Sequence, residues 1–177
     1  KKWIVIKNIV SPNLIIKQAN NNVNECISLK DDNKITIATV ARLAEQKGIE
    51  VAIDACKILI DRGYKVEWIV VGEGSERGKL EERIKSNGLE KDFNLIGSRV
   101  NPYPYIKNCD IYVQPSRWEG FGITVLEAKI LNKPIIVSNI PEFREQIVNN
   151  ENGLIFNDMN ELVKDIINIM ENDLLSE

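Results

Sequence analysis

The chain has 177 residues, 44% of them hydrophobic and 28% charged, a composition typical of one globular domain and not of a disordered chain. Its 23 Lys and Arg residues nearly balance 26 Asp and Glu residues, so the sequence predicts no basic surface for nucleic acid or for an anionic membrane. Because the chain contains no His, mechanisms that need a Ser-His pair, a Cys-His pair or a His-based metal centre within it are excluded.

Residues 1–34 are expected to connect and not to form a core. An apolar segment at Ile4–Ile6 is followed by a polar stretch that includes three consecutive Asn at 20–22. Asn-rich composition of this kind is typical of linkers and surface connections. The sequence therefore predicts a connector and polar lead-in over residues 1–34 and a folded domain over residues 35–177.

From residue 35 onwards, short β-branched runs alternate with longer helical patterns. Runs such as Ile69-Val70-Val71 are apolar at consecutive positions, as expected for strands buried on both faces of a parallel sheet. The predicted strands are Ile35–Ala41, Val66–Val71, Phe93–Ile96, Ile111–Val113, Ile135–Val137 and Leu154–Phe156. The predicted helices are Gly48–Arg62, Glu76–Asn87, Tyr103–Asn108, Gly122–Leu131, Glu142–Asn149 and Asn160–Glu171. Six strand–helix alternations predict an α/β fold, a doubly wound parallel sheet of the Rossmann-like type.

The cysteines and the apolar runs indicate the cellular compartment of the chain. Cys26, Cys56 and Cys109 form no Cys-x-x-Cys pair, so neither a metal knuckle nor a redox dithiol is expected, and Cys56 fits a small core residue of a helix. Apolar runs such as Trp68–Val71 are too short to span a bilayer, and the apolar stretch at the first residues is too short for a signal peptide. These features favour a cytoplasmic location.

In a doubly wound sheet, ligands bind at the carboxyl ends of the strands, where helix N-termini converge. The loop after the first predicted strand places Arg42 at such an end and Lys47 at the start of a helix. A cation is unfavourable beside the positive end of a helix dipole unless an anion lies in front of it. Since both side chains bind phosphate oxygens, the loop predicts a phosphate site. The alternative is that both are ordinary surface charges.

The loop after the second predicted strand, Gly72-Glu73-Gly74, is Gly-rich, as dinucleotide-binding turns are. The following strand ends in Gly97-Ser98-Arg99, without the acidic residue that would bind a ribose hydroxyl. A lone Gly-rich turn is a weak indicator. The sequence thus favours a tight turn that lets the backbone approach a ligand over an NAD site.

The loop after the fourth predicted strand carries the most specific pattern. Gly120 and Gly122 remove side chains just where a helix begins, which predicts outward-facing amides at Gly122, Ile123 and Thr124. Unpaired amides at a helix N-terminus bind phosphate.

Two carboxylates bracket this site, Glu119 in the loop and Glu127 about one and a half turns into the helix. Carboxylates near a phosphate site need hydroxyl or cationic partners, and sugar and ribose hydroxyls are suitable. The alternative is that Glu119 caps the helix and Glu127 forms a surface ion pair. The apolar neighbours of Glu127 favour a position facing the cleft.

These residues resemble a known family. Glu119 to Glu127, read as Glu-Gly-Phe-Gly-Ile-Thr-Val-Leu-Glu, is similar to the EX7E motif of the retaining glycosyltransferases of family 4, also called glycosyl transferases group 1. The resemblance runs from Ile35 to Asn157, with Ala41 replacing a common Gly and Ser138–Glu145 lacking a common Gly pair. Further segments similar to family motifs are Val40–Leu43 with Lys47-Gly48 (phosphate loop), Val71–Gly74 (second loop), Cys109–Ser116 (strand before the motif) and Ile4–Val10 (interdomain connector).

The resemblance implies a GT-B enzyme of two Rossmann-like domains, of which this chain would supply the C-terminal, donor-binding one without the N-terminal acceptor domain. Such an enzyme moves a sugar from a nucleoside-diphosphate sugar to a glycan or lipid-linked acceptor, with retention of configuration, in cell-surface polysaccharide or glycoconjugate synthesis. It would require no metal or other cofactor, because cationic side chains and helix amides would neutralise the leaving diphosphate. The parent enzyme would be cytoplasmic or peripheral at the inner face of the membrane.

The resemblance also implies residue roles. Glu119 would act at the donor sugar, Glu127 would hold the ribose hydroxyls, and the backbone around Gly97–Val100 would read the base. The expected catalytic residues are Glu119, Arg42 and Lys47. The expected donor-binding residues are Glu127, Gly72, Gly97, Arg99, Val100, Gly120, Phe121, Gly122, Ile123 and Thr124.

Three other functions stay open on the sequence: a nucleotide-binding module without catalysis, a sugar-nucleotide epimerase of related fold, and an NAD-dependent dehydrogenase, which the second loop disfavours. An epimerase would use the same donor without an acceptor. Because transfer needs water excluded and the acceptor positioned, the domain by itself is expected to fold but not to transfer sugar.

Overall fold

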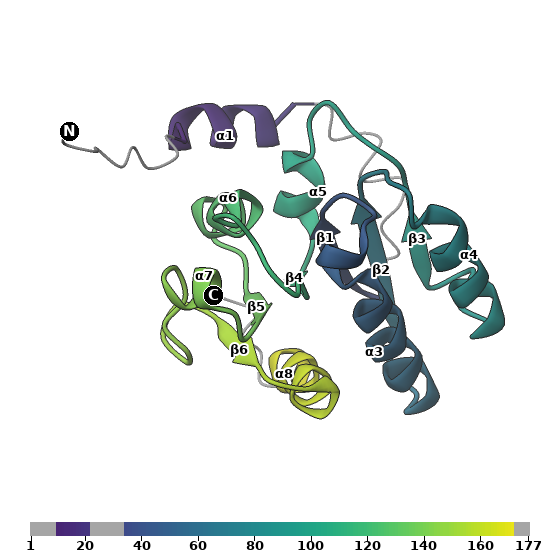
Figure 1. Cartoon of the computed structure of the whole chain (residues 1–177). Helices are drawn as coiled ribbons and strands as arrows, with labels where there is room; N and C mark the ends of the chain where they lie inside the picture. The colour runs from purple at the N-terminus through teal and green to yellow at the C-terminus, as the bar shows by residue number, and fades with distance from the viewer. Residues whose placement is uncertain (1–9, 22–33, 172–177) are drawn as a thin grey trace, which may run out of the picture.

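A computed structural model describes residues 10–21 and 34–171 of the chain. The strands are β1 (Ile35–Val40), β2 (Val66–Val71), β3 (Phe93–Leu95), β4 (Ile111–Gln114), β5 (Ile135–Ser138) and β6 (Leu154–Phe156). They form one sheet in the order β3-β2-β1-β4-β5-β6, and every neighbouring pair is parallel (Figure 1). All six predicted strands are confirmed to within one residue at each end, and so is the doubly wound parallel sheet.

The helices follow the predicted alternation with two exceptions, at α1 and α7. They are α1 (Pro12–Ala19), α3 (Ile49–Asp61), α4 (Arg77–Ser86), α5 (Tyr103–Asn108), α6 (Ile123–Ile130), α7 (Pro141–Arg144) and α8 (Met159–Glu171), with a 3-10 turn at Glu45–Lys47. The other five predicted helices are confirmed to within one residue at each end.

Helices cover both faces of the sheet, and the alternation of strand side chains decides which residue meets which layer. Ile37 and Val113 pack in one apolar cluster with α3 and α8. Their chain neighbours Ala38 and Tyr112 point to the opposite face and pack in a second cluster with α5 and α6 (Figure 1). Consecutive apolar residues are therefore required in the central strands, because both of their faces are buried.

The strand order reverses next to β1, and this positions the site. β1 pairs with β2 on one side and with β4 on the other. The chain runs outward from β1 to β3 in one direction and from β4 to β6 in the other. Connections that leave neighbouring strands in opposite directions open a crevice at their carboxyl ends, where ligands bind in such sheets.

Helix α1 corrects the expectation that residues 1–34 contain no core element. It begins at Pro12, directly after Ser11, a common start because proline lacks the amide hydrogen that the first helical turn leaves unused. Ile15 and Ala19 are buried where α1 packs against α5 and α6. The extended segment at Ile4–Ile6 and Cys26 lie outside the described residues. Of the segment Ile4–Val10, which resembles the family's interdomain connector, only Val10 is described.

Helix α7 is shorter than the predicted Glu142–Asn149, because Asn side chains replace helical hydrogen bonds. It ends at Arg144. Beyond it, Asn152 Oδ1 accepts from the Val148 amide and Asn149 Oδ1 accepts from the Ile155 amide, both at 2.9 Å. Asn150 takes the left-handed conformation at φ 63°. Asn favours such local alternatives to the helix.

The described cysteines are buried thiols. Cys56 packs in the core, as predicted, and its burial, with Asp92 nearby, raises the pKa of its thiol to about 12. Cys109 is buried in the second cluster. Among the described helices, none is long and apolar enough to cross a membrane.

Candidate active site

A cavity of about 570 Å³ opens at the carboxyl ends of β1 and β2, beside the loop that leads from β4 into α6. It lies at the crevice that the strand order predicts. Four loops line it: those after β1, β2 and β3, and the loop before α6.

The cavity brings together most of the predicted site residues. Those that line it are Arg42, Lys47, Gly72, Arg99, Glu119, Gly120, Phe121, Gly122, Ile123 and Thr124. Gly97, Val100 and Glu127 are not among the lining residues. Ser98, which belongs to the segment expected to read the base, lines the cavity, and so do Glu73 and Pro102, which have no predicted role.

The segment expected to read a base is only partly at the cavity. Ser98 and Arg99 line it, but Val100 is fully exposed to solvent. The Gly97 carbonyl accepts the Gly72 amide at 3.0 Å and so ties the loops after β2 and β3 together. Gly97 and Val100 therefore do not line the cavity and their donor-binding role stays a prediction, whereas Ser98 and Arg99 line the cavity on this side.

The glycines after β2 allow the loop after β2 to pack closely against the loop after β1. A methyl group on Gly72 would lie 1.8 Å from the Ala41 carbonyl oxygen, and one on Gly74 would lie 2.2 Å from the Leu43 carbonyl oxygen. The amide of Leu43 also donates to the Glu73 carbonyl at 2.9 Å. The prediction of a tight turn is right, but the backbone it approaches is that of the loop after β1.

The anion in front of Lys47 is Glu119. Lys47 Nζ lies 2.7 Å from both carboxylate oxygens of Glu119, and the two side chains are only 14% and 7% exposed. Residues 72 positions apart in the chain thus meet at the switch point of the sheet. The expectation that Glu119 needs a cationic partner is confirmed, and the expectation that it caps α6 is not, since the residue before α6 is Gly122.

Arg42 supplies the cavity's unneutralised cation. It is exposed and lines the cavity, and among the described residues it has no ion-pair partner. The other lining carboxylate, Glu73, pairs with Arg77 at 2.6 Å, and this guanidinium holds the pKa of Glu73 below its usual range. Because both lining carboxylates are paired, Arg42 faces the cavity as a positive group suited to phosphate oxygens.

Glu127 lies behind the cavity and is held by a tyrosine. It is 8% exposed and accepts a hydrogen bond from the Tyr103 hydroxyl at 3.1 Å. Burial raises the pKa of Glu127, and the hydrogen bond from Tyr103 lowers it by a smaller amount. A hydroxyl partner is thus present in the protein itself, and Glu127 is not among the residues that line the cavity, so its role toward a donor stays a prediction.

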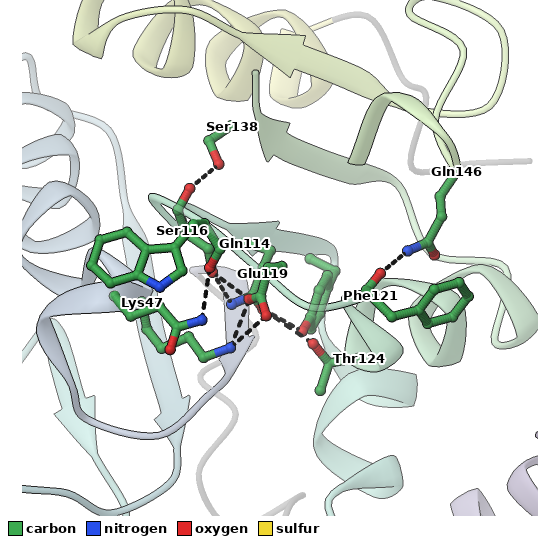
Figure 2. Close-up of polar contacts among 11 residues, drawn as sticks. Lys47, Gln114, Ser116, Glu119, Phe121, Thr124, Ser138 and Gln146 are labelled. Atoms are coloured by element: carbon green, nitrogen blue, oxygen red, sulfur yellow. Dashed lines mark hydrogen bonds and ion pairs between the residues drawn. The ribbon is translucent and has the colours of Figure 1, made fainter. Parts of the chain in front are cut away.

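The first turn of α6 presents backbone to the cavity. Gly122 takes the left-handed conformation at φ 76°, and a methyl group there would lie 2.6 Å from the Phe143 ring. Gln146 Nε2 donates to the Phe121 carbonyl and fixes the loop from behind (Figure 2). Ile123 and Thr124 then line the cavity with amides that, as at any helix start, have no carbonyl partner within the helix.

Two polar residues that sequence reasoning missed complete the site. Gln114 and Ser116 are each 1% exposed and connect to Glu119 by hydrogen bonds (Figure 2). A signal for them was present, because Tyr112, Gln114 and Ser116 alternate along a strand whose other residues are apolar. Buried polar groups need partners, so such an alternation indicates a hydrogen-bond network on one face.

Within residues 10–21 and 34–171, no group of three or more Cys, Asp or Glu side chains is arranged to hold a metal ion.

Residues 22–177 match the family model described as Glycosyl transferases group 1. The O-antigen biosynthesis glycosyltransferase WclY of Escherichia coli is 32% identical over 141 residues, which make up 80% of this chain and 38% of WclY. The capsular polysaccharide biosynthesis glycosyltransferase CapM of Staphylococcus aureus is 30% identical over 140 residues, 77% of this chain and 36% of CapM. The chain therefore spans less than half the length of these relatives.

The fold has a close counterpart among solved structures. The crystal structure of HepE from Anabaena in complex with UDP matches with a TM-score of 0.82 at 23% identity, over 97% of this chain and 49% of HepE. At this identity the likeness shows a shared fold.

Proposed function

This chain belongs to the glycosyl transferases group 1 family, and we propose that it binds the nucleoside-diphosphate sugar of a retaining glycosyltransferase. The observation that carries the proposal is the cavity at the switch point, where Arg42, Lys47 and the first amides of α6 converge. Such a set of groups suits a diphosphate. The relatives WclY and CapM, named for O-antigen and capsular polysaccharide biosynthesis, support an acceptor in a cell-surface glycan or a lipid-linked precursor.

The chemistry follows from where charge develops. Cleavage of the bond between the anomeric carbon and the diphosphate leaves oxocarbenium character on the sugar and negative charge on the leaving group. Arg42, Lys47 and the amides at Ile123 and Thr124 would stabilise that charge. We propose that these groups carry the diphosphate's charge without a metal ion.

The two carboxylates have different proposed roles. Glu119 lines the cavity and would act at the donor sugar, next to the reacting carbon. Glu127 would accept hydrogen bonds from the ribose hydroxyls. Because a carboxylate has several acceptor sites, it would keep its hydrogen bond from Tyr103 at the same time. Ser98 and Arg99 would face the base.

The acceptor would be positioned by a second, N-terminal domain of the parent enzyme, and the chain by itself is proposed to bind donor without transferring sugar. The other three candidates are less well supported: a module without catalysis and an epimerase do not account for relatives named as transferases, and an NAD enzyme lacks the acidic ribose ligand after β3. The buried thiols Cys56 and Cys109 favour a cytoplasmic location.

The test is a calorimetric titration of this chain with UDP, GDP, ADP and the matching nucleosides. We expect one diphosphate to bind, and Arg42→Ala to weaken it by about 1–2 kcal/mol, the lower part of the range for a charged hydrogen bond because Arg42 is exposed. The binding free energy of the nucleoside should change by less than about 0.3 kcal/mol in this variant, since the nucleoside has no phosphate for Arg42 to bind.

The matched control is Arg62→Ala, an exposed arginine at the opposite end of α3, which should leave both affinities unchanged. Equal losses for diphosphate and nucleoside in Arg42→Ala would rule out a phosphate role for this loop. Wild-type protein that binds none of the diphosphates would rule out the proposed function.

A further inference from the structure

We propose that Ser116 and Gln114 are positioning residues that hold the Glu119 carboxylate in the direction it needs for the donor sugar. This inference rests on the proposed function, in which Glu119 acts at that sugar. Neither side chain lines the cavity. Both would act only through Glu119, by way of a chain of hydrogen bonds.

The chain of hydrogen bonds starts inside the sheet and ends at the cavity. The Tyr112 hydroxyl donates to Gln114 Oε1 at 2.8 Å, Gln114 Nε2 donates to Ser116 Oγ at 3.0 Å, and Ser116 Oγ donates to Glu119 Oε1 at 2.7 Å. Tyr112, Gln114 and Ser116 are each at most 1% exposed, so water does not compete for these bonds. Figure 2 shows Gln114, Ser116, Glu119 and Lys47 joined by these hydrogen bonds and by the ion pair.

The donors and acceptors allow only one direction for this chain. The Glu119 carboxylate, which pairs with Lys47, can only accept, so the single hydrogen of the Ser116 hydroxyl points to it. Ser116 Oγ must then accept from Gln114, and only the amide nitrogen of Gln114 can donate, so Gln114 Oε1 faces the hydroxyls of Tyr112 and of Thr124, the latter at 3.3 Å. Burial raises the pKa of Tyr112, which keeps its proton available at the start of the chain.

The backbone of this segment is also fixed. Tyr112 and Gln114 lie on one face of β4, and Ser116 continues their alternation after the strand ends. The Ser138 hydroxyl, at the end of the neighbouring strand β5, donates to the Ser116 carbonyl (Figure 2). Ser116 therefore has little freedom to turn away from Glu119.

The contact from Ser116 has a property that the contact from Lys47 lacks. In the proposed function Lys47 binds the diphosphate, so a bound donor draws it from Glu119. Ser116 has no access to the cavity and keeps its hydrogen bond to Glu119 when the donor binds. The buried chain thus keeps the carboxylate in place when its cation is shared with the ligand.

A purely structural network would give a different result on mutation. If Ser116 only stabilised the fold, its loss would weaken every ligand alike or none. If Ser116 positions Glu119, loss of the Ser116 hydroxyl should weaken the binding of the sugar nucleotide and leave that of the diphosphate unchanged. In a protein that already carries Glu119→Gln, the same loss should have no further effect.

The experiment measures the affinity of this chain for UDP, UDP-glucose, UDP-N-acetylglucosamine, GDP and GDP-mannose, each titrated separately. The variants are then compared on a diphosphate that binds and on its sugar nucleotide. The variants are Ser116→Ala, Ser116→Thr, Glu119→Gln and the double variant Ser116→Ala/Glu119→Gln. The control is Thr39→Val, which removes a fully buried hydroxyl on β1 that donates to the Val113 carbonyl at 2.8 Å and does not touch Glu119.

We expect Ser116→Ala to lower the affinity for the sugar nucleotide relative to the diphosphate by about five- to tenfold, the size of one ordinary hydrogen bond. Ser116→Thr, which keeps the hydroxyl, should restore the wild-type ratio, and Thr39→Val should not change it. The double variant should match Glu119→Gln to within about twofold, because residues acting through one another are not additive.

Two outcomes overturn the inference while the proposed function stands. In the first, Ser116→Ala weakens the binding of diphosphate and of sugar nucleotide equally. In the second, the affinity that the double variant loses equals the sum of the losses in Ser116→Ala and in Glu119→Gln. Wild-type protein that binds none of UDP, GDP and ADP overturns the proposed function itself. If Ser116→Ala does not fold, Gln114→Met tests the same chain, since it leaves the Ser116 hydroxyl free to turn. It should then shift the same ratio by a smaller factor of about two to three, and an unchanged ratio overturns the inference.

Discussion

The ion pair between Lys47 and Glu119 gives the most direct test of the site. Lys47→Ala leaves a carboxylate that is 7% exposed with the Ser116 hydroxyl as its remaining donor. Removing one partner of a fully buried pair costs about 3–5 kcal/mol, and an exposed pair is worth about 0–1 kcal/mol. Because Lys47 is 14% exposed and Ser116 stays in place, we expect the free energy of unfolding to fall by about 2–3 kcal/mol.

Urea unfolding of the wild type and the variant measures this change, with Lys79→Ala as the control. Lys79 pairs with Glu76 at 3.1 Å but is 76% exposed, so its loss should cost less than about 1 kcal/mol. Lys47→Ala combined with Glu119→Gln should recover most of the stability, because no unpaired charge is left. The same double variant should still bind the diphosphate weakly, since the cation is gone.

The reasoning would be refuted if Lys47→Ala destabilised the protein no more than Lys79→Ala, or if the double variant were less stable than Lys47→Ala alone. Either result would mean that Glu119 is not held by Lys47 in solution. Recovery of stability together with full recovery of diphosphate affinity would instead remove Lys47 from the proposed phosphate site.

Two further predictions concern the buried carboxylate and a glycine. Burial raises the pKa of Glu127 above its usual value of 4.5, so the protonated form favours folding, and that advantage is lost as the pH rises through the folded-state pKa. Glu127→Gln should therefore gain stability relative to wild type as the pH rises above about 4.5, and should weaken the binding of the nucleoside diphosphate by about 1–2 kcal/mol. A stability difference that does not change with pH would contradict this. Gly48→Ala should destabilise by more than about 3 kcal/mol, because its methyl group would lie 2.2 Å from the Pro115 carbonyl oxygen, whereas Gly63→Ala, also at positive φ but with open space, should cost about 1 kcal/mol in thermal unfolding. Equal costs would contradict the clash.

Much of the site could be predicted because its parts are local in the sequence. Arg42 follows a β-branched strand, and the glycines at 120 and 122 precede an apolar helical pattern, so each was assigned to the carboxyl edge of the sheet. Edges of parallel strands collect such loops, and the cavity confirms that Arg42 and residues 119–124 meet there. The hydrogen bond from Tyr103 to Glu127 could not be predicted, since a helical position alone does not say which neighbour the side chain faces.

The sequence by itself determined the six strands, five of the helices and the parallel sheet, because hydrophobic periodicity and helix start and stop signals act over a few residues. Only the tertiary structure decided which distant residues share an environment. Lys47 finds Glu119 across 72 positions, Gly48 lies against Pro115, and α1 packs on α5 and α6 where polar composition predicted a linker. These contacts depend on strand order and on which loops the reversal beside β1 brings together, and a local pattern carries no information about either.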